Sequence, residues 1–186
     1  MSIREAVQAA RQQAGRERAA ALAALDELFA EGRLPNPPPE GRYRGELLTP
    51  SLHPWLDAFG RAFTGWWLPW QGKTFSRAAH TGDNIFTNDG QWLARLVWPT
   101  YRGYVPDGAG QTRALQFRTY SGPGRLDPSV SVFKIDYDWD VNPRFLVRSV
   151  LDELVQVDDD YYLGKALLRQ RTGAYVCAAY FALSPA

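Results

Sequence analysis

The 186-residue sequence has little of several things that define common protein classes. It has one cysteine, Cys177, so it can form neither an intramolecular disulfide nor a thiolate metal cluster. Its 21 basic and 20 acidic residues nearly cancel, which removes the positive surface that nucleic acid and anionic lipid require. It has no run of about 18 apolar residues, and residues 1–30 lack the apolar core of a signal peptide. We therefore predict a cytoplasmic protein with no membrane span and no nucleic-acid partner.

Chemical motifs are equally scarce. The two histidines, His53 and His80, occur in no HExxH or His-x-His pattern, so we predict no metal site. The sequence also lacks the G-x-S-x-G nucleophile motif and a glycine-rich loop leading into a helix. For these reasons we leave catalytic residues unassigned and favour binding over catalysis.

Aromatic residues, in contrast, are abundant and unevenly placed. Residues 1–40 contain one, Phe29, whereas residues 55–104 contain twelve, including six of the seven tryptophans. Large aromatics at spacings of three and four, from Trp55 to Trp66, predict a helix over residues 51–67. They either fill a core or form a wall or lid over a ligand pocket. If exposed, so apolar a stripe would support self-association, which makes a homodimer a third interpretation.

The chain divides into three parts. Residues 1–32 predict one long helix, with a capping box of Ser2 and Glu5 and ten alanines between residues 6 and 30. Residues 33–41 contain three consecutive prolines, which predict a stiff extended connector. Residues 42–186 then form the main domain.

That domain reads mostly as antiparallel strands. Alternating apolar and polar residues, separated by turns that contain glycine, proline and asparagine, predict a series of strands. Residues 142–157 fit either a helix or a strand, and we favour a short helix that gives way to a strand near Val150. A meander this long tends to close, because closure removes edge strands. We predict an α+β fold, mainly antiparallel β, forming a barrel of about 7–9 strands with a long N-terminal helix and one or two short inserted helices. The predicted strands are residues 41–48, 70–75, 113–120, 130–139, 161–169 and 174–183.

Two groups of short motifs resemble known families. Residues 41–45 (GRYRG) and 70–75 (WQGKTF) are similar to the GxWxG-domain family of uncharacterised proteins, although Tyr43 stands where that family has tryptophan. Residues 136–138 (DYD), 158–165 (DDDYYLGK) and 180–183 (YFAL) are similar to the companion domain. More loosely, the glycine and aromatic residue of the first strand and the final meander resemble lipocalin-like and nitrobindin-like barrels. The resemblance implies a barrel. The resemblance to nitrobindin-like barrels also suggests haem as a cofactor, which would need His80, His53, a tyrosine or Cys177 as its axial ligand.

Lysine is rare, with three residues among the 21 basic ones, and each of the three lies in a predicted strand. Strand alternation places Lys134, Asp136 and Asp138 on one face and Tyr137 on the other. If the polar face points into the barrel, Lys134 pairs with Asp136 or Asp138 and orients a ligand head group. If it points outward, these charges are simply solvated.

We thus predict that the barrel interior binds a small, largely hydrophobic molecule whose head group meets polar side chains. One alternative is an enzyme that uses the same cavity for acid and base chemistry, with Asp136, Asp138, Asp152 or Glu153 opposite Lys73 or Lys165. Another is an interaction protein with a solid core. The candidate ligand-binding residues are Tyr43, Trp66, Trp70, Lys73, Phe75, Asn84, Arg118, Lys134, Asp136, Tyr162 and Lys165.

Overall fold

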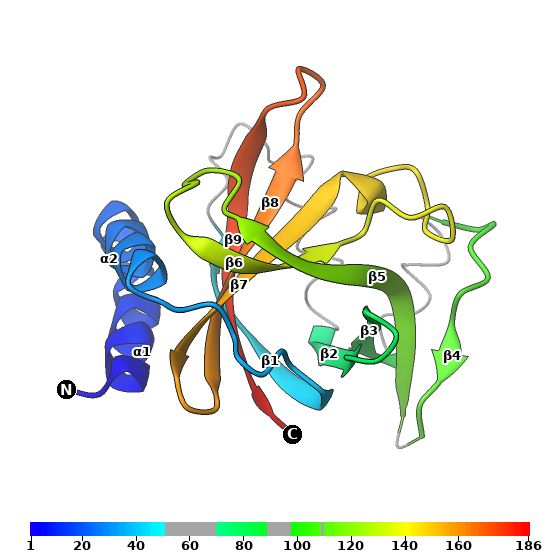
Figure 1. The fold of residues 1–186 in the computed structure, drawn as a ribbon, viewed down its shortest axis with the longest axis horizontal. Helices are drawn as coiled ribbons and strands as arrows, with labels where there is room; N and C mark the ends of the chain where they lie inside the picture. The colour runs from blue at the N-terminus through cyan, green and yellow to red at the C-terminus, as the bar shows by residue number, and fades with distance from the viewer. Residues whose placement is uncertain (51–69, 89–97, 109) are drawn as a thin grey trace.

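The computed structural model of the protein describes residues 1–50, 70–88, 98–108 and 110–186 (Figure 1). The aromatic helix predicted over residues 51–67, which includes Trp66, lies outside the described residues, and so does His53. Among the helices that are described, none combines the length and the apolar character needed to cross a bilayer.

Two short helices occupy the region where the sequence predicted one long helix. Helix α1 spans Ile3–Gln13 and helix α2 spans Arg18–Ala30. The capping box is confirmed, because the Glu5 backbone N–H donates to Ser2 Oγ and the Ser2 backbone N–H donates to Glu5 Oε2. The predicted single helix is wrong at residues 14–17, around Gly15, where glycine is costly in a helix interior. The break allows each short helix to bury its own apolar side.

Nine strands follow the helices in the described part of the chain. The predicted change from helix to strand near Val150 is confirmed, since a short 3-10 helix, η3 (Val147–Ser149), leads directly into a strand. The strands are β1 (Gly41–Pro50), β2 (Trp70–Ser76), β3 (Thr81–Thr87), β4 (Val105–Pro106), β5 (Gln111–Pro123), β6 (Ser131–Asp136), β7 (Val150–Asp158), β8 (Tyr161–Arg169) and β9 (Tyr175–Pro185).

The strands form a closed antiparallel barrel. Their order is β3-β2-β1-β9-β8-β7-β6-β5-β4, and an additional β3–β5 pairing joins the ends, so that eight strands close the ring and β4 stays outside it. Strand β5 makes this possible because it is long. On one edge it pairs with β3, and on the other Thr112 and Arg113 pair with β4 and its second half pairs with β6. The predicted barrel of about 7–9 strands is confirmed.

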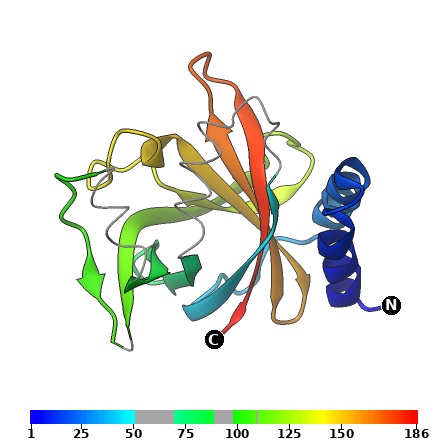
Figure 2. The same cartoon turned by 180° about the vertical axis from the view of Figure 1, so that it is seen from behind.

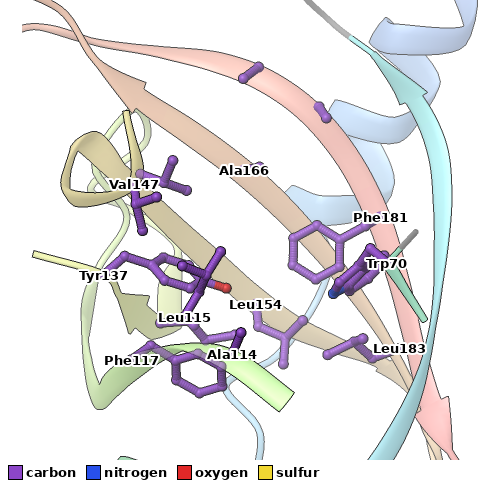
Figure 3. Packing of buried hydrophobic residues seen from close by; sticks show 14 of the residues in the cluster. Trp70, Ala114, Leu115, Phe117, Tyr137, Val147, Leu154, Ala166, Phe181 and Leu183 are labelled. Carbon is purple, nitrogen blue, oxygen red and sulfur yellow. The ribbon is translucent and has the colours of Figure 1, made fainter. Parts of the chain in front are cut away.

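The barrel wall separates two apolar clusters. The inner cluster fills the barrel and includes Trp70, Phe117, Tyr137 and Phe181 (Figure 3). The outer cluster lies between the barrel and the two helices, which sit together on one side of it (Figures 1 and 2). It joins apolar residues of both helices to β6, β7, β8 and β9 through Val7, Leu25, Phe29, Val132, Val155, Leu163, Tyr180 and Ala182.

The connector fixes the helices to the barrel. Arg33 and Gln156 exchange two backbone hydrogen bonds of 3.0 and 2.7 Å, and Leu34 packs against the inner cluster. Farther along, the Arg77 backbone N–H donates to Glu40 Oε2 at 2.6 Å. Strand β9 is covered on both faces, because Phe181 belongs to the inner cluster and Tyr180 to the outer one.

Candidate functional site

The candidate site begins with three polar or aromatic residues that lie side by side across the barrel wall. Lys73 of β2 stands directly opposite Tyr43 of β1 and Asn84 of β3. Residues directly opposite one another in a sheet share a face, so all three belong to the same side of the wall. Lys73 is 1% exposed, and its surroundings are the aromatic rings of the inner cluster, so this side is the barrel interior.

Strand β7 supplies the counter-charge. Asp152 faces Ile135 on β6 and Ala166 on β8, and the Asp152 side chain is 2% exposed. Its Oδ2 lies 2.9 Å from Lys73 Nζ. The next residue, Glu153, points to the opposite side of the sheet, as strand alternation requires. Asp152 and Lys73 therefore form a buried ion pair inside the barrel.

Two further side chains complete a hydrogen-bonded cluster around Lys73. Its ammonium donates to Asn84 Oδ1 at 2.9 Å and, over a shorter distance, to the Tyr137 hydroxyl. The Tyr137 hydroxyl lies 3.1 Å from Asn84 Oδ1 and 3.3 Å from Asp152 Oδ2. Asn84 Oδ1 also accepts from Trp70 Nε1 at 3.1 Å, while its Nδ2 donates to the Leu115 carbonyl at 3.0 Å. The three N–H groups of Lys73 are thus all engaged.

Aromatic rings enclose the ammonium on several sides. Lys73 Nζ lies 5.1 to 5.5 Å from the ring centroids of Trp70, Phe117, Tyr137 and Phe181. Trp70 and Phe181 pack edge to face, with centroids 5.7 Å apart, and Figure 3 shows them next to each other. Rings at this distance attract a cation through their quadrupoles and partly replace its lost hydration.

Burial shifts the proton affinities of all three titratable groups. Removal from water lowers the pKa of Lys73 below its usual 10.5, and the charge of Asp152 opposes this shift. Removal from water likewise raises the pKa of Asp152 above 3.8, against the effect of Lys73. The pKa of Tyr137 is raised well above 10, first by burial and then by Asp152, so its hydroxyl remains a hydrogen-bond donor. Lysine and aspartate together carry no net charge.

One polar atom of the cluster is unpartnered. Asp152 Oδ1 is buried and has no hydrogen-bond partner among the described residues. The cluster borders a recess with about 270 Å³ of empty space, measured out to its open side, and about 20 Å³ of it can hold the centre of a water molecule. That is room for a single water-sized group. The lining residues are Trp70, Lys73, Asn84, Phe86, Tyr137, Val150 and Asp152.

Two close approaches of the backbone hold Trp70 and β2 in place. A Cβ on Gly45 would overlap the six-membered ring of Trp70, so only glycine lets that ring lie against β1. Gly72 has φ +148°, and a Cβ there would overlap the Tyr43 carbonyl. It lies at a register shift between β2 and β3, next to Lys73. A bulge of this kind redirects the side chains around it.

The structure gathers some of the predicted site residues and separates the others. Trp70, Lys73 and Asn84 line the recess. Tyr43, Phe75 and Tyr162 also lie inside the barrel, where Tyr43 packs edge to face against the other two at 5.4 and 5.6 Å.

Four predicted site residues lie outside the barrel interior. The expected pairing of Lys134 with Asp136 or Asp138 is wrong: Lys134 pairs with Glu153, at 2.6 Å, and both lie on the outer face. Lys165 is also on the outer face and contacts Asp26 of α2 at 2.5 Å. Arg118 stacks on Trp139, 4.8 Å from its ring centroid, and Asp136 accepts from the Tyr120 hydroxyl at 3.3 Å.

The predicted list omitted Tyr137, Phe86, Val150 and Asp152, which line the recess. For Tyr137 a signal existed, because alternation had placed it on the face opposite Lys134. Asp152 had been considered as a carboxylate opposite Lys73, but without a way to choose it over three other acidic residues.

A second and larger depression, with about 600 Å³ of empty space measured out to its open side, lies along β2, β3 and β5. Its charged groups pair with each other. Arg113 is 3.3 Å from Asp83, which also accepts a short hydrogen bond from Thr74, and burial is the largest cause of the raised pKa of Asp83. Arg113 Nε is buried without a hydrogen bond but lies 3.3 Å from Asp107 Oδ1, whereas Asp152 Oδ1 has no hydrogen-bond partner among the described residues, so we take the first recess as the candidate site.

The described residues do not support the haem that the resemblance to nitrobindin-like barrels suggested, and His53 lies outside them. His80 lies at the exposed turn between β2 and β3, and the space at Lys73 holds one water-sized group. Among the described residues, no three histidine, cysteine or acidic side chains are grouped as metal ligands would be.

Comparison with known proteins supports the fold. No family model matches the chain, so the naming of the GxWxG family has no support, and no curated protein matches it either. The crystal structure of a protein from Thermomonospora curvata is similar, with a TM-score of 0.50 and 16% sequence identity over 95% of this chain and 98% of that one. At this identity the likeness concerns the fold alone.

Proposed function

We propose that the protein binds a small, mostly apolar molecule, with the apolar body of the ligand in the outer part of the recess and its polar end at the Lys73 cluster. The observation that supports this proposal is that the polar cluster is energetically costly to bury. Lys73, Asn84, Tyr137 and Asp152 are each 3% exposed or less, inside a barrel otherwise filled by apolar side chains. Burying charged groups costs several kcal/mol per ion, roughly, and brings no stability over apolar residues of similar volume. A binding role gives a reason for their presence.

The shape of the recess agrees with a ligand of this kind. Trp70, Phe86 and Val150 provide an apolar lining, while the polar groups converge at one place. Binding sites for small molecules typically combine such a lining with a few placed polar groups. Because the recess as a whole has room for about one water-sized group, a larger ligand must extend into its open side.

Ligand binding is tested with the purified protein in two ways. Native mass spectrometry reports any molecule that copurifies, and tryptophan fluorescence follows titration with a panel of small apolar compounds. We expect at least one compound to change the fluorescence, since Trp70 lines the recess. No added mass together with unchanged fluorescence across the panel would favour a solid-core interaction protein.

The chain offers a matched pair of variants for this test. Lys73→Met and Lys134→Met each break an ion pair made by a buried strand lysine, but only the first lies inside the barrel. We expect Lys73→Met to weaken binding about tenfold or more, because the polar end loses its hydrogen-bonded setting. Lys134→Met should bind as the wild type does. Equal loss in both variants would point to a general effect on folding.

The same cluster supports a second candidate, proton transfer on the bound molecule. Tyr137 and Asp152 lie within 3.3 Å of each other beside a lysine, and pairs of groups with displaced proton affinities serve as acid and base. In an assay that finds turnover, Asp152→Asn should abolish turnover even at saturating substrate. Full turnover in that variant would remove Asp152 from the mechanism.

A further inference from the structure

The hydrogen bonds of the Lys73 cluster restrict what the polar end of a ligand can be. A lysine beside an apolar recess would ordinarily suggest an anionic partner such as a carboxylate. Here, however, the three donors of Lys73 are taken by Asp152, Asn84 and Tyr137. An incoming carboxylate would find no free N–H on Lys73 and would meet the like charge of Asp152.

The free capacity of the cluster is that of an acceptor. Asp152 Oδ2 is occupied by Lys73, and Asp152 Oδ1 is the buried oxygen without a partner among the described residues. A buried carboxylate oxygen without a donor is costly, and an N–H or O–H that reaches it relieves the cost. The complementary group is therefore a hydrogen-bond donor.

The charge of the cluster and the size of the recess restrict the class of ligand further. The Lys73 and Asp152 charges cancel, so a charged head group would enter the barrel without a counter-ion. The recess as a whole has about 20 Å³ for the centre of a water-sized group, which suits a hydroxyl better than the two oxygens of a carboxylate. In the absence of ligand, a water molecule is the natural occupant of such a space.

We infer that the ligand is an uncharged alcohol or phenol whose hydroxyl donates to Asp152 Oδ1 in place of a water molecule, with its apolar part against Trp70, Phe86 and Val150. This inference rests on the proposed function and specifies the ligand class for that same site. It excludes fatty acids and other carboxylates as ligands of the recess.

Three one-ring compounds of similar size test the inference on the wild-type protein: benzyl alcohol, toluene and benzoate, each titrated by calorimetry. We expect benzyl alcohol to bind about tenfold or more tightly than either of the others, because a hydrogen bond to a charged group is worth at least that much. If toluene or benzoate binds as tightly as benzyl alcohol, the inference is overturned and the proposed function stands. If none of the three binds, the inference is overturned, while the proposed function is decided by the mass-spectrometry and fluorescence tests.

A variant pair reports the same discrimination through Asp152. In Asp152→Asn the charge of Lys73 is no longer balanced, so benzoate should gain affinity and benzyl alcohol should lose it, reversing the order. The control is Glu153→Gln, the neighbouring residue on β7, whose side chain lies outside the barrel and which should keep the wild-type order. An unchanged order in Asp152→Asn would overturn the role given to Asp152. The wild-type titrations decide the ligand class even if that variant does not fold.

Discussion

The variant Lys73→Met would leave Asp152 as a buried carboxylate without its cation. The two side chains are 1% and 2% exposed, so water cannot take the place of the ammonium. Breaking a buried pair in this way typically costs about 3–5 kcal/mol. The electrostatic part of this cost has an upper limit, because the Asp152 carboxylate can take up a proton instead. Protonating a carboxylate of ordinary pKa at pH 7 costs about 4 kcal/mol. We therefore expect the free energy of unfolding to fall by about 4 kcal/mol at pH 7.

The pH dependence of this loss has a definite sign. In Lys73→Met the pKa of Asp152 is higher in the folded than in the unfolded state, because burial raises it and no cation opposes the shift. The folded variant then binds the extra proton, and its stability is lost as pH rises above the unfolded pKa. At pH 5 protonation of Asp152 costs about 1.5 kcal/mol. The loss of unfolding free energy relative to the wild type should therefore be smaller than at pH 7 by up to about 2.5 kcal/mol. Urea unfolding followed by far-UV circular dichroism at pH 5 and pH 7 measures both values.

The double variant Lys73→Met/Asp152→Val shows whether the ion pair is present for stability. Replacing a buried pair with apolar side chains is commonly neutral or stabilising by about 1–4 kcal/mol. We expect the double variant to recover at least the stability that Lys73→Met loses, and to lose binding of benzyl alcohol. If the double variant is as unstable as the single one, the pair is a net stabiliser and the reasoning that assigns it to binding is refuted.

Two further predictions concern the supports of the site. Gly45→Ala should displace the Trp70 ring, lower the melting temperature and weaken ligand binding. Gly122→Ala is the control in a strand, because a Cβ there would lie at an ordinary distance of 3.5 Å from Lys134. Equal effects of the two variants would contradict the role of Gly45 in making room for the Trp70 ring. Lys165→Met should remove the contacts with Asp26 and the Phe29 ring, so that backbone amides of α2 exchange hydrogen faster while ligand affinity is unchanged. Unaltered exchange across residues 18–30 would show that the apolar contacts of α2 suffice to hold it.

The strands were predictable from the sequence because their signals are local. Alternation and turn residues placed the strand over residues 161–169 where β8 is found, and the change of structure near Val150 followed from residues close to it. The break between α1 and α2 was missed. Alanine-rich sequence on both sides of Gly15 satisfies helix propensity, and the reason to stop is tertiary, since both short helices pack on the same wall.

The candidate site was predictable in part. The rarity of lysine drew attention to Lys73, and Asn84 and Trp70 were also among the predicted ligand-binding residues. Its ion-pair partner, Asp152, is far away in the sequence and is placed by barrel closure, which no local pattern encodes. Strand alternation paired Lys134 with Asp136 or Asp138, because these residues share a strand face. The residue directly across the sheet is Glu153, and opposite residues lie closer than residues two apart in one strand.

The neighbouring carboxylates of β7 also settle how that strand aligns with its partners. Apolar alternation has a period of two, so sliding β7 by two residues would keep every apolar side chain on its proper face. The same slide would carry Asp152 and Glu153 roughly 7 Å along the strand and away from Lys73 and Lys134. Four buried charges would then stand unpaired. The apolar pattern thus selects which face of β7 is inside, and the two ion pairs select one alignment among those that the pattern permits.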